Sequence, residues 1–315
     1  ALQHAAVTGP LGETVNACWG ISGDGTTAFI EMAAASGLAL VPPAQRNPLT
    51  TTSRGTGELI LAALDKGARN IIIGIGGSAT NDGGAGMVDA NGTDIGYGGG
   101  SLVALNHIDT SGLDPRLKHC AIRVACDVTN PLVGETGASR IFGPQKGATE
   151  AMIVELDTNL GHFADVIKAS LRIDVKNMPG AGAAGGMGAA LTAFLGAELR
   201  SGIEIVTQAL HLEEHIHDCT LVVTGEGRLD SQSIHGKVPV GVASVAKKYH
   251  KPVIGIAGSL TRDVAVVHQY GIDAVFSVLN SIGTLEEAFR NASDNIYRAS
   301  RNVAATLRVG MHMRG

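Results

Sequence analysis

A glycine-rich stretch after a short aliphatic run is the first place where this sequence could do chemistry. It reads GIGGSATNDGGAG over residues 74–86 and follows Asn-Ile-Ile-Ile. Glycine permits positive φ and lets a ligand approach the main chain, and bare N–H groups beside hydroxyls can cradle an anion. We predict phosphate or substrate-anion binding, with a helix beginning at the last glycine pair and its N–H groups facing outward. The candidates are Gly76, Gly77, Ser78, Thr80, Asn81, Gly83 and Gly84.

Asp82 lies in the same stretch and is a hard oxygen ligand that could hold Mg²⁺ beside the phosphates. The stretch is not a Walker A motif, because no Gly-Lys-Ser/Thr follows, and it is not GxGxxG. A glycine-rich connector with ordinary capping residues would have the same composition. The helix after Gly84 can be only a turn long, because the turn Asp-Ala-Asn-Gly follows at 89–92.

A second constellation is TGEGRLDSQSIHGKVPVG, residues 224–241, which follows a predicted strand. Glu226, Asp230 and Lys237 bring three charges into one glycine-punctuated loop. A carboxylate can accept a hydroxyl proton or bind Mg²⁺, and a lysine can neutralise a phosphoryl group. A surface turn with a solvated Arg228–Asp230 pair is the alternative. We favour function, because ligands of α/β sheets bind at the carboxyl ends of strands. His235 is interpreted as a turn residue.

Weaker candidates lie elsewhere in the chain. Asp127 ends another strand and could meet substrate or metal, or only cap its turn. Lys146, in FGPQKGA, could bind an anionic ligand or be an exposed, solvated lysine. MPGAGAAGGMGAAL, from residue 178, suits either nucleotide contact or close helix packing. His211 and His215 are spaced i,i+4 without an HExxH pattern, so a polar helix face explains them better than a metal site.

Strands and helices that alternate along the chain must position these residues. This pattern predicts an α/β fold with a largely parallel sheet and two lobes that divide between about residues 200 and 218. The predicted strands are 70–75, 122–127, 220–224, 253–257 and 274–278, and the clearest helices are 52–68 and a final one with an apolar stripe from 285 to 307.

Composition excludes several classes of protein. The net charge is −5 and no basic stripe is present, so nucleic acid is an unexpected partner. No apolar run approaches the roughly 20 residues that span a membrane, which favours the cytoplasm. The four cysteines lack CxxC spacing. The chain begins without Met, and its C-terminal lobe shows few strands, so we expect part of the protein to be missing from this sequence.

Four long motifs together resemble the type I glycerate kinases, the bacterial glycerate 2-kinase family. They are GIGGSATNDGGAGM, ACDVTNPLVGETGASRIFGPQKGA, PGAGAAGGMGAAL and TGEGRLDSQSIHGKVPVGVA. The resemblance runs essentially end to end. It implies a Rossmann-like parallel-sheet lobe (211–315), an inserted central α/β lobe (1–210) and an active site in the cleft between them. Family members begin with a segment that carries PDSFK-like and DGGEG motifs, and these are absent here.

The resemblance also implies ATP-dependent, Mg²⁺-dependent phosphorylation of glycerate to 2-phosphoglycerate. On that interpretation Asp82 and Asp230 are the candidates for the metal or for the hydroxyl proton, with Asp230 favoured as base. Lys237 would stabilise the transferred charge and Glu226 would contact the nucleotide. Glycerate would be bound by the following residues: Asp127, Lys146 and Arg54. A kinase for another hydroxy acid, a phosphatase-like hydrolase and a catalytically silent regulator remain alternatives. Assembly as a homodimer is a further expectation.

Overall fold

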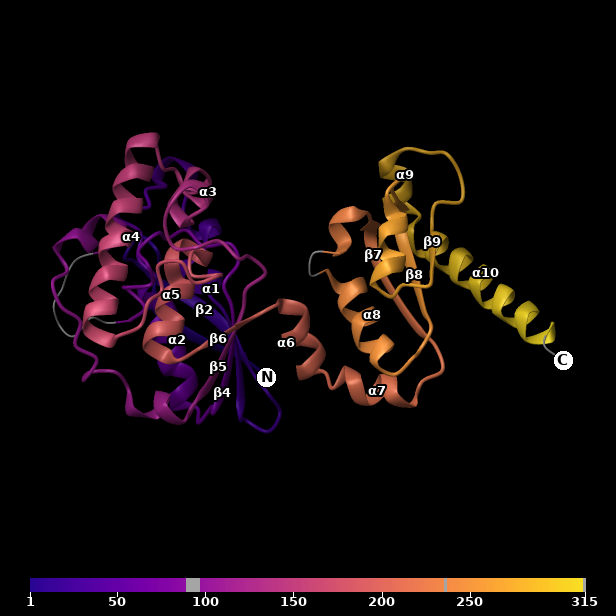
Figure 1. Ribbon diagram of the computed structural model, residues 1–315, viewed down its shortest axis with the longest axis horizontal. Helices are drawn as coiled ribbons and strands as arrows, with labels where there is room; N and C mark the ends of the chain where they lie inside the picture. The colour runs from indigo at the N-terminus through magenta and orange to yellow at the C-terminus, as the bar shows by residue number, and fades with distance from the viewer. Residues whose placement is uncertain (89–96, 235–236, 314–315) are drawn as a thin grey trace. The chain divides into compact units, whose positions relative to one another are not determined.

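The computed structural model describes residues 1–88, 97–234 and 237–313, and the chain divides into two compact units, Ala1–Gly202 and Ile203–Gly315 (Figure 1). The division lies within the predicted range of about 200–218 and a few residues before residue 210, because Ile203 packs against residues of the second unit. A Cβ at Gly241 would lie 2.1 Å from the Cγ1 atom of Ile203. The interpretation of the units as central and Rossmann-like lobes stays a prediction. The predicted turn at 89–92 and His235 lie outside the described residues.

The first unit contains a six-stranded sheet, within its described residues, in the order β1-β2-β3-β4-β5-β6. The strands β1, β2 and β3 pair antiparallel, and β3 to β6 run parallel. β4 and β5 confirm two predicted strands, whereas the first three strands and β6 were not predicted. The strands are β1 Leu2–Thr8, β2 Thr14–Ile21, β3 Thr27–Glu31, β4 Asn70–Gly74, β5 Ala121–Ala125 and β6 Glu198–Arg200.

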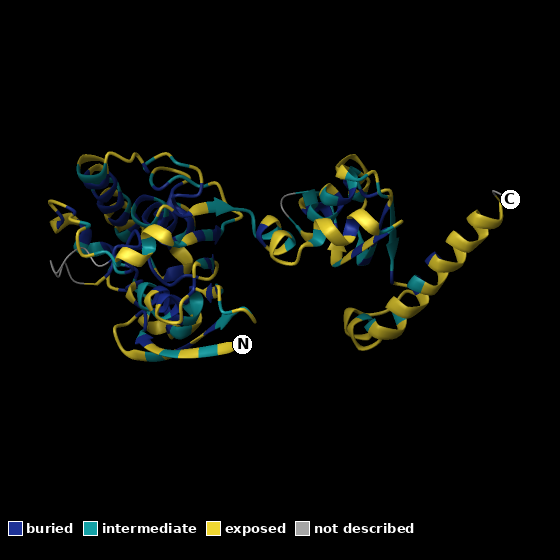
Figure 2. Ribbon diagram, turned by 90° about the horizontal axis from the view of Figure 1, so that it is seen from below, coloured by how far each residue is buried: buried dark blue, intermediate teal, exposed yellow. Residues whose placement is uncertain are grey.

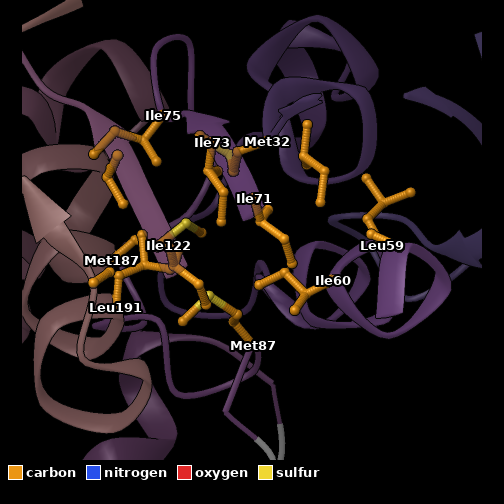
Figure 3. Packing of buried hydrophobic residues seen from close by; sticks show 14 of the residues in the cluster. Met32, Leu59, Ile60, Ile71, Ile73, Ile75, Met87, Ile122, Met187 and Leu191 are labelled. Carbon is orange, nitrogen blue, oxygen red and sulfur yellow. The ribbon is translucent and has the colours of Figure 1, made fainter. Parts of the chain in front are cut away.

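Five α-helices are described in this unit: α1 Ala33–Ser36, α2 Arg54–Asp65, α3 Ala138–Phe142, α4 Glu150–Leu171 and α5 Ala183–Leu195. The predicted helix 52–68 is confirmed as α2. Its buried face, with Leu59 and Ile60, packs with Ile71 and Ile73 of β4 in one core that also contains Met187 of α5 (Figure 3). The isoleucines of β4 suit this place because β-branched side chains favour strands. The core therefore fixes the carboxyl end of β4, where the glycine-rich stretch begins.

The second unit has a parallel sheet in the order β7-β8-β9, within its described residues. Its strands are β7 Val222–Leu229, β8 Val253–Leu260 and β9 Ala274–Ser277, and its helices are α6 Gly202–Ala209, α7 Leu212–Asp218, α8 Val238–Lys248, α9 Leu285–Arg290 and α10 Ala292–His312. All three predicted strands are confirmed. The prediction of one final helix is wrong, because Asn291 interrupts it and separates α9 from α10. Much of α10 is exposed (Figure 2).

The α/β prediction is confirmed by both sheets, in which parallel pairing predominates. None of the described helices combines the length and the apolar character that crossing a membrane requires.

Candidate active site

The glycine-rich stretch leaves β4 with an exposed turn and then enters the interior. Gly76 and Gly77 are exposed, and a Cβ at Gly76 would meet no atom within 4 Å. Gly77 has a φ of +73°, which the turn requires and glycine adopts without strain. From Ser78 to Gly84 every residue is buried. The structure thus leaves open main chain only at Gly76 and Gly77 among the predicted phosphate-binding residues.

Asp82 is held as a structural acceptor. Its carboxylate is 2% exposed. Oδ2 accepts from the backbone N–H of Ser53 at 2.9 Å, from the Ser53 hydroxyl at 2.7 Å and from the N–H of Gly86 at 3.3 Å. Oδ1 accepts from the N–H of Gly84 at 3.1 Å. Three of these donors share Oδ2 and one binds Oδ1, so protein groups already engage most of the four lone-pair sites of this carboxylate. This geometry favours a positioning role for Asp82 over metal binding or proton transfer.

The prediction that Gly83 and Gly84 begin a helix with outward N–H groups is wrong. The N–H of Gly83 donates to the carbonyl of Gly185 at 3.0 Å, and that of Gly84 donates to Asp82. Both glycines have positive φ, and a Cβ on Gly83 would lie 2.7 Å from the Phe163 ring. Close packing, and not anion binding, therefore accounts for this glycine pair.

Lys146 is the largest fully buried side chain in the described chain, at 1% exposure, so the alternative of an exposed, solvated lysine is wrong. Its ammonium donates to the carbonyl of Thr80 at 2.6 Å. Burial lowers the pKa of Lys146 to about 7, against the opposing effect of the Asp82 charge. Nearby, the amide nitrogen of Asn81 donates to the Ser139 hydroxyl at 2.9 Å. Predicted candidates from two separate motifs, Lys146 and Thr80, thus come together.

The other two candidates of this unit lie on its surface. Arg54, the first residue of α2, is exposed, and its Nε atom donates to Glu58 at 3.2 Å. Its neighbour Ser53 binds Asp82, so Arg54 stands close along the chain to the glycine-rich stretch. Asp127 accepts from the N–H of Gly202 at 2.8 Å. This bond joins the end of β5 to a residue far along the chain, so it is not the local cap of its own turn that was the alternative for Asp127.

Asp230 forms the charged centre of the second unit. Its Oδ1 lies 3.5 Å from the ammonium of Lys237, and its Oδ2 lies 3.4 Å from Nε of Arg228. Ser233 donates to Oδ1 at 3.1 Å. Burial acts to raise the pKa of Asp230, but the Ser233 hydrogen bond and the two cations outweigh it and lower the pKa. The Arg228–Asp230 pair, which the alternative of a surface turn required, is present, and Lys237 also pairs with Asp230.

Glu226 lies on β7, four residues before Asp230. It lines a mostly apolar cavity of about 640 Å³ formed by β7, β8, α9 and α10, and Asp230 is not among the lining residues. The Oε2 atom of Glu226 is buried without a hydrogen-bond partner in the described part of the chain. Glu226 thus lines a cavity to whose described lining Asp230 and Lys237 do not contribute, although one loop motif contains all three.

Comparisons with known proteins place the chain in a family. The model of the glycerate kinase family matches residues 1–308. The chain belongs to this family. It is 79% identical over 323 residues to the glycerate 2-kinase of Escherichia coli K12, across 100% of this chain and 85% of the relative. It is 55% identical to the glycerate kinase of Bacillus subtilis 168, across 98% and 82%.

A solved structure has the same fold. A crystal structure attributed to glycerate kinase 2 of Salmonella typhimurium LT2 is 62% identical, with a TM-score of 0.88 over 99% of this chain and 84% of that one. The family and this likeness identify the chain as an enzyme of the kinase class.

Kinases of small molecules use Mg²⁺ with their nucleotide, and Asp230 and Asp82 are the candidate ligands in this member of the glycerate kinase family. Mg²⁺ takes one or two carboxylates, with waters and substrate phosphates as its other ligands. Asp230 fits, because its pKa is lowered and its side chain is 15% exposed. Asp82 fits less well, since it is 2% exposed and four protein donors bind its oxygens. No cluster of three or more His, Cys, Asp or Glu suited to a metal occurs among the described residues.

Two residues that touch the candidates were missed from the sequence, Ser53 and Ser139. Ser53 belongs to a buried run of hydroxyls, Thr51 to Ser53, just before α2. Three hydroxyl residues next to an N-capping position were the available signal for it. Ser139 lies inside one of the motifs that carry the family resemblance, but its local sequence does not indicate that it contacts Asn81.

Proposed function

We propose that this protein transfers the γ-phosphoryl group of ATP to glycerate and forms 2-phosphoglycerate. The observation that carries the proposal is the 79% identity to a protein named glycerate 2-kinase, across the whole of this chain. The Asp230–Lys237 pair supports it with suitable chemistry, since phosphoryl transfer needs positioned charge and a carboxylate near the attacking hydroxyl.

Asp230 is the proposed residue for the acceptor hydroxyl or for the cation. Its lowered pKa keeps it ionised at neutral pH, so it can accept a hydrogen bond and orient the hydroxyl. A weak base suffices when the transition state is loose and the proton moves late. Mg²⁺, when bound with ATP, would neutralise phosphate charge, and Asp230 is the residue that would hold it. Lys237 precedes α8 as its N-cap and would stabilise the transferred phosphoryl group.

The first unit supplies the proposed contacts to phosphate and to the glycerate carboxylate. The exposed backbone at Gly76 and Gly77 is the part of the glycine-rich stretch that phosphate oxygens can approach. Arg54 is the proposed partner of the glycerate carboxylate, because its guanidinium is exposed. Lys146, the other candidate cation, already donates to Thr80. We keep Glu226 as a nucleotide contact, because its unpartnered oxygen lies at a cavity.

A coupled assay of ADP release across several small hydroxy acids tests the substrate, and ³¹P and ¹³C NMR of the product tells which hydroxyl carries the phosphate. We expect turnover with glycerate and a phosphate on carbon 2. Faster turnover of another hydroxy acid would refute the substrate. Release of inorganic phosphate without an acceptor would favour a hydrolase.

The Asp230→Asn substitution tests the role of the charged centre. We expect kcat to fall by about 10²-fold or more, because the orienting carboxylate is lost. Asp218→Asn is the matched control, since Asp218 is exposed at the end of α7. Near-normal turnover in Asp230→Asn, with a melting temperature like that of the control, would show that Asp230 has no part in the reaction.

A further inference from the structure

Lys146 is a fully buried lysine to which the proposed chemistry assigns no role. Its ammonium has one hydrogen-bond partner among the described residues, the carbonyl of Thr80. Moving an ammonium out of water is costly unless an opposite charge and further hydrogen bonds replace the water. Stability does not explain this lysine, and residues that break such a local rule are expected at functional sites.

The turn that carries Lys146 is built to point it inward. It is the short 3-10 helix Pro144–Lys146, which ends at Gly147 with a φ of +90°. A Cβ at Gly147 would lie 2.5 Å from the carbonyl oxygen of Arg46, so only glycine fits against the backbone of that loop. Arg46 in turn donates through Nη1 to the carbonyl of Gln145 at 3.3 Å. These contacts fix the turn against the segment around Arg46.

Lys146 and Ser139 form hydrogen bonds to two consecutive residues of the glycine-rich stretch. Lys146 donates to the carbonyl of Thr80 at 2.6 Å, and Ser139 accepts from the amide of Asn81 at 2.9 Å. Gly185 packs against the same carbonyl, because a Cβ there would lie 2.0 Å from the Thr80 oxygen. These contacts therefore fix the loop at Thr80 and Asn81, shortly after its exposed turn at Gly76 and Gly77.

Thr80 and Asn81 each have a polar side-chain atom without a hydrogen-bond partner in the described structure. Oγ1 of Thr80 and Oδ1 of Asn81 are buried and have no hydrogen-bond partner in the described structure. The nearest opposing charge, Asp82, is already bonded to Ser53 and to backbone N–H groups. The polar interior beneath the loop thus costs stability at several neighbouring atoms, which is the pattern of a segment shaped for a ligand.

We infer that Lys146 is a positioning residue for phosphoryl transfer: its bond to Thr80 fixes the loop so that the exposed turn at Gly76 and Gly77 is held for the phosphates. The inference rests on the proposed function. Phosphoryl transfer depends on placing the reacting groups, and a displacement near 1 Å can cost about 10²-fold in rate. Loss of a positioning contact should lower kcat, whereas loss of a direct substrate contact should raise KM.

The test is Lys146→Met in the purified protein, with Lys168→Met as the control. Methionine has nearly the same length but no charge and no N–H donor, and Lys168 is an exposed lysine of α4 that pairs with Asp174 at 2.6 Å. For Lys146→Met we expect kcat to fall by about tenfold or more, KM for glycerate to change by less than about threefold, and amide hydrogen exchange in residues 76–84 to quicken. The control should match the unsubstituted protein in all three measurements.

Several results would overturn the inference. An unchanged kcat refutes it, as does a rise in the KM for glycerate with kcat preserved, which would make Lys146 a direct substrate contact. Failure of Lys146→Met to fold also refutes it, because the argument requires that the lysine is not kept for stability. If the unsubstituted protein shows no turnover with glycerate, the proposed function fails, and the exchange measurement alone then decides whether Lys146 holds the loop.

Discussion

Raising the pH from 7 to 9 should stabilise the first unit, and Lys146→Met should abolish that gain. Burial lowers the pKa of Lys146 from 10.5 to about 7 in the folded chain. Between these two values the unfolded chain binds the proton and the folded chain has released it. Stability rises with pH wherever the unfolded state binds more protons, so the folded state gains as the pH increases from about 7 towards 10.5.

The size of the effect follows from the difference between the two pKa values. Each pKa unit corresponds to about 1.4 kcal/mol. The folded lysine is about half protonated at pH 7, so the slope is partial at first and nearly full by pH 8. The free energy of unfolding should therefore rise by about 2 kcal/mol between pH 7 and 9. Asp82 is the charged group that acts on Lys146, and its effect is already contained in the folded value.

Urea unfolding followed by tryptophan fluorescence measures this prediction. The chain has one tryptophan, and Trp19 is 3% exposed in the core of the first unit, so its emission reports on that unit. The same measurement on Lys146→Met removes the contribution of every other titrating group by difference. At pH 7 the variant should be at least as stable as the unsubstituted protein. Parallel pH dependence in the two proteins would refute the argument that Lys146 is buried and half neutral.

Two further predictions use the same unfolding assay. Asp82→Asn should destabilise the first unit by about 1–3 kcal/mol, because an amide nitrogen would face N–H donors that the carboxylate now accepts. Asp65→Asn, which breaks the exposed pair with Arg116, should lower the free energy of unfolding by under about 1 kcal/mol. Equal losses in the two variants would refute the argument that the hydrogen bonds to Asp82 stabilise the first unit. Gly185→Ala should cost about 2 kcal/mol or more, because φ is +69° and the Cβ would lie 2.0 Å from the Thr80 oxygen. Gly76→Ala, which meets open space, should change stability by under about 0.5 kcal/mol, and a similar loss in both glycine variants would contradict the packing argument.

Much of the parallel sheet could be predicted because its strands are short β-branched runs that end in glycine. The runs that became β4, β7 and β8 have this pattern, whereas β9, Ala-Val-Phe-Ser, was predicted from its short apolar run alone. The hairpin of β1 and β2 was missed because its residues alternate weakly and include Thr, Asn and Gly, which also suit turns. The division of the last helix at Asn291 was missed because the apolar spacing continues through the break.

The candidate site was predictable in its residue types but not in its burial. Single residues at the sheet edge, such as Asp230 and Lys237, have the charged contacts that the loop composition indicated. Lys146 looked like a surface lysine because glycine and glutamine surround it in sequence. Its burial depends on Gly147 fitting against Arg46, a contact between distant segments that no local pattern contains. For the same reason the glycines at 83 and 84 resembled an anion cradle, although distant side chains pack against them.

The change from antiparallel to parallel pairing at β3 has a consequence for how the chain first acquires its shape. β1 and β2 are joined by a short connection, so their pairing closes a small loop and can form early. β6 can join β5 only after the long excursion through α3, α4 and α5 has been brought back. The pairing of β5 with β6 is then a late event, and until it occurs β5 presents an open edge from which a nascent chain could pair with a neighbour.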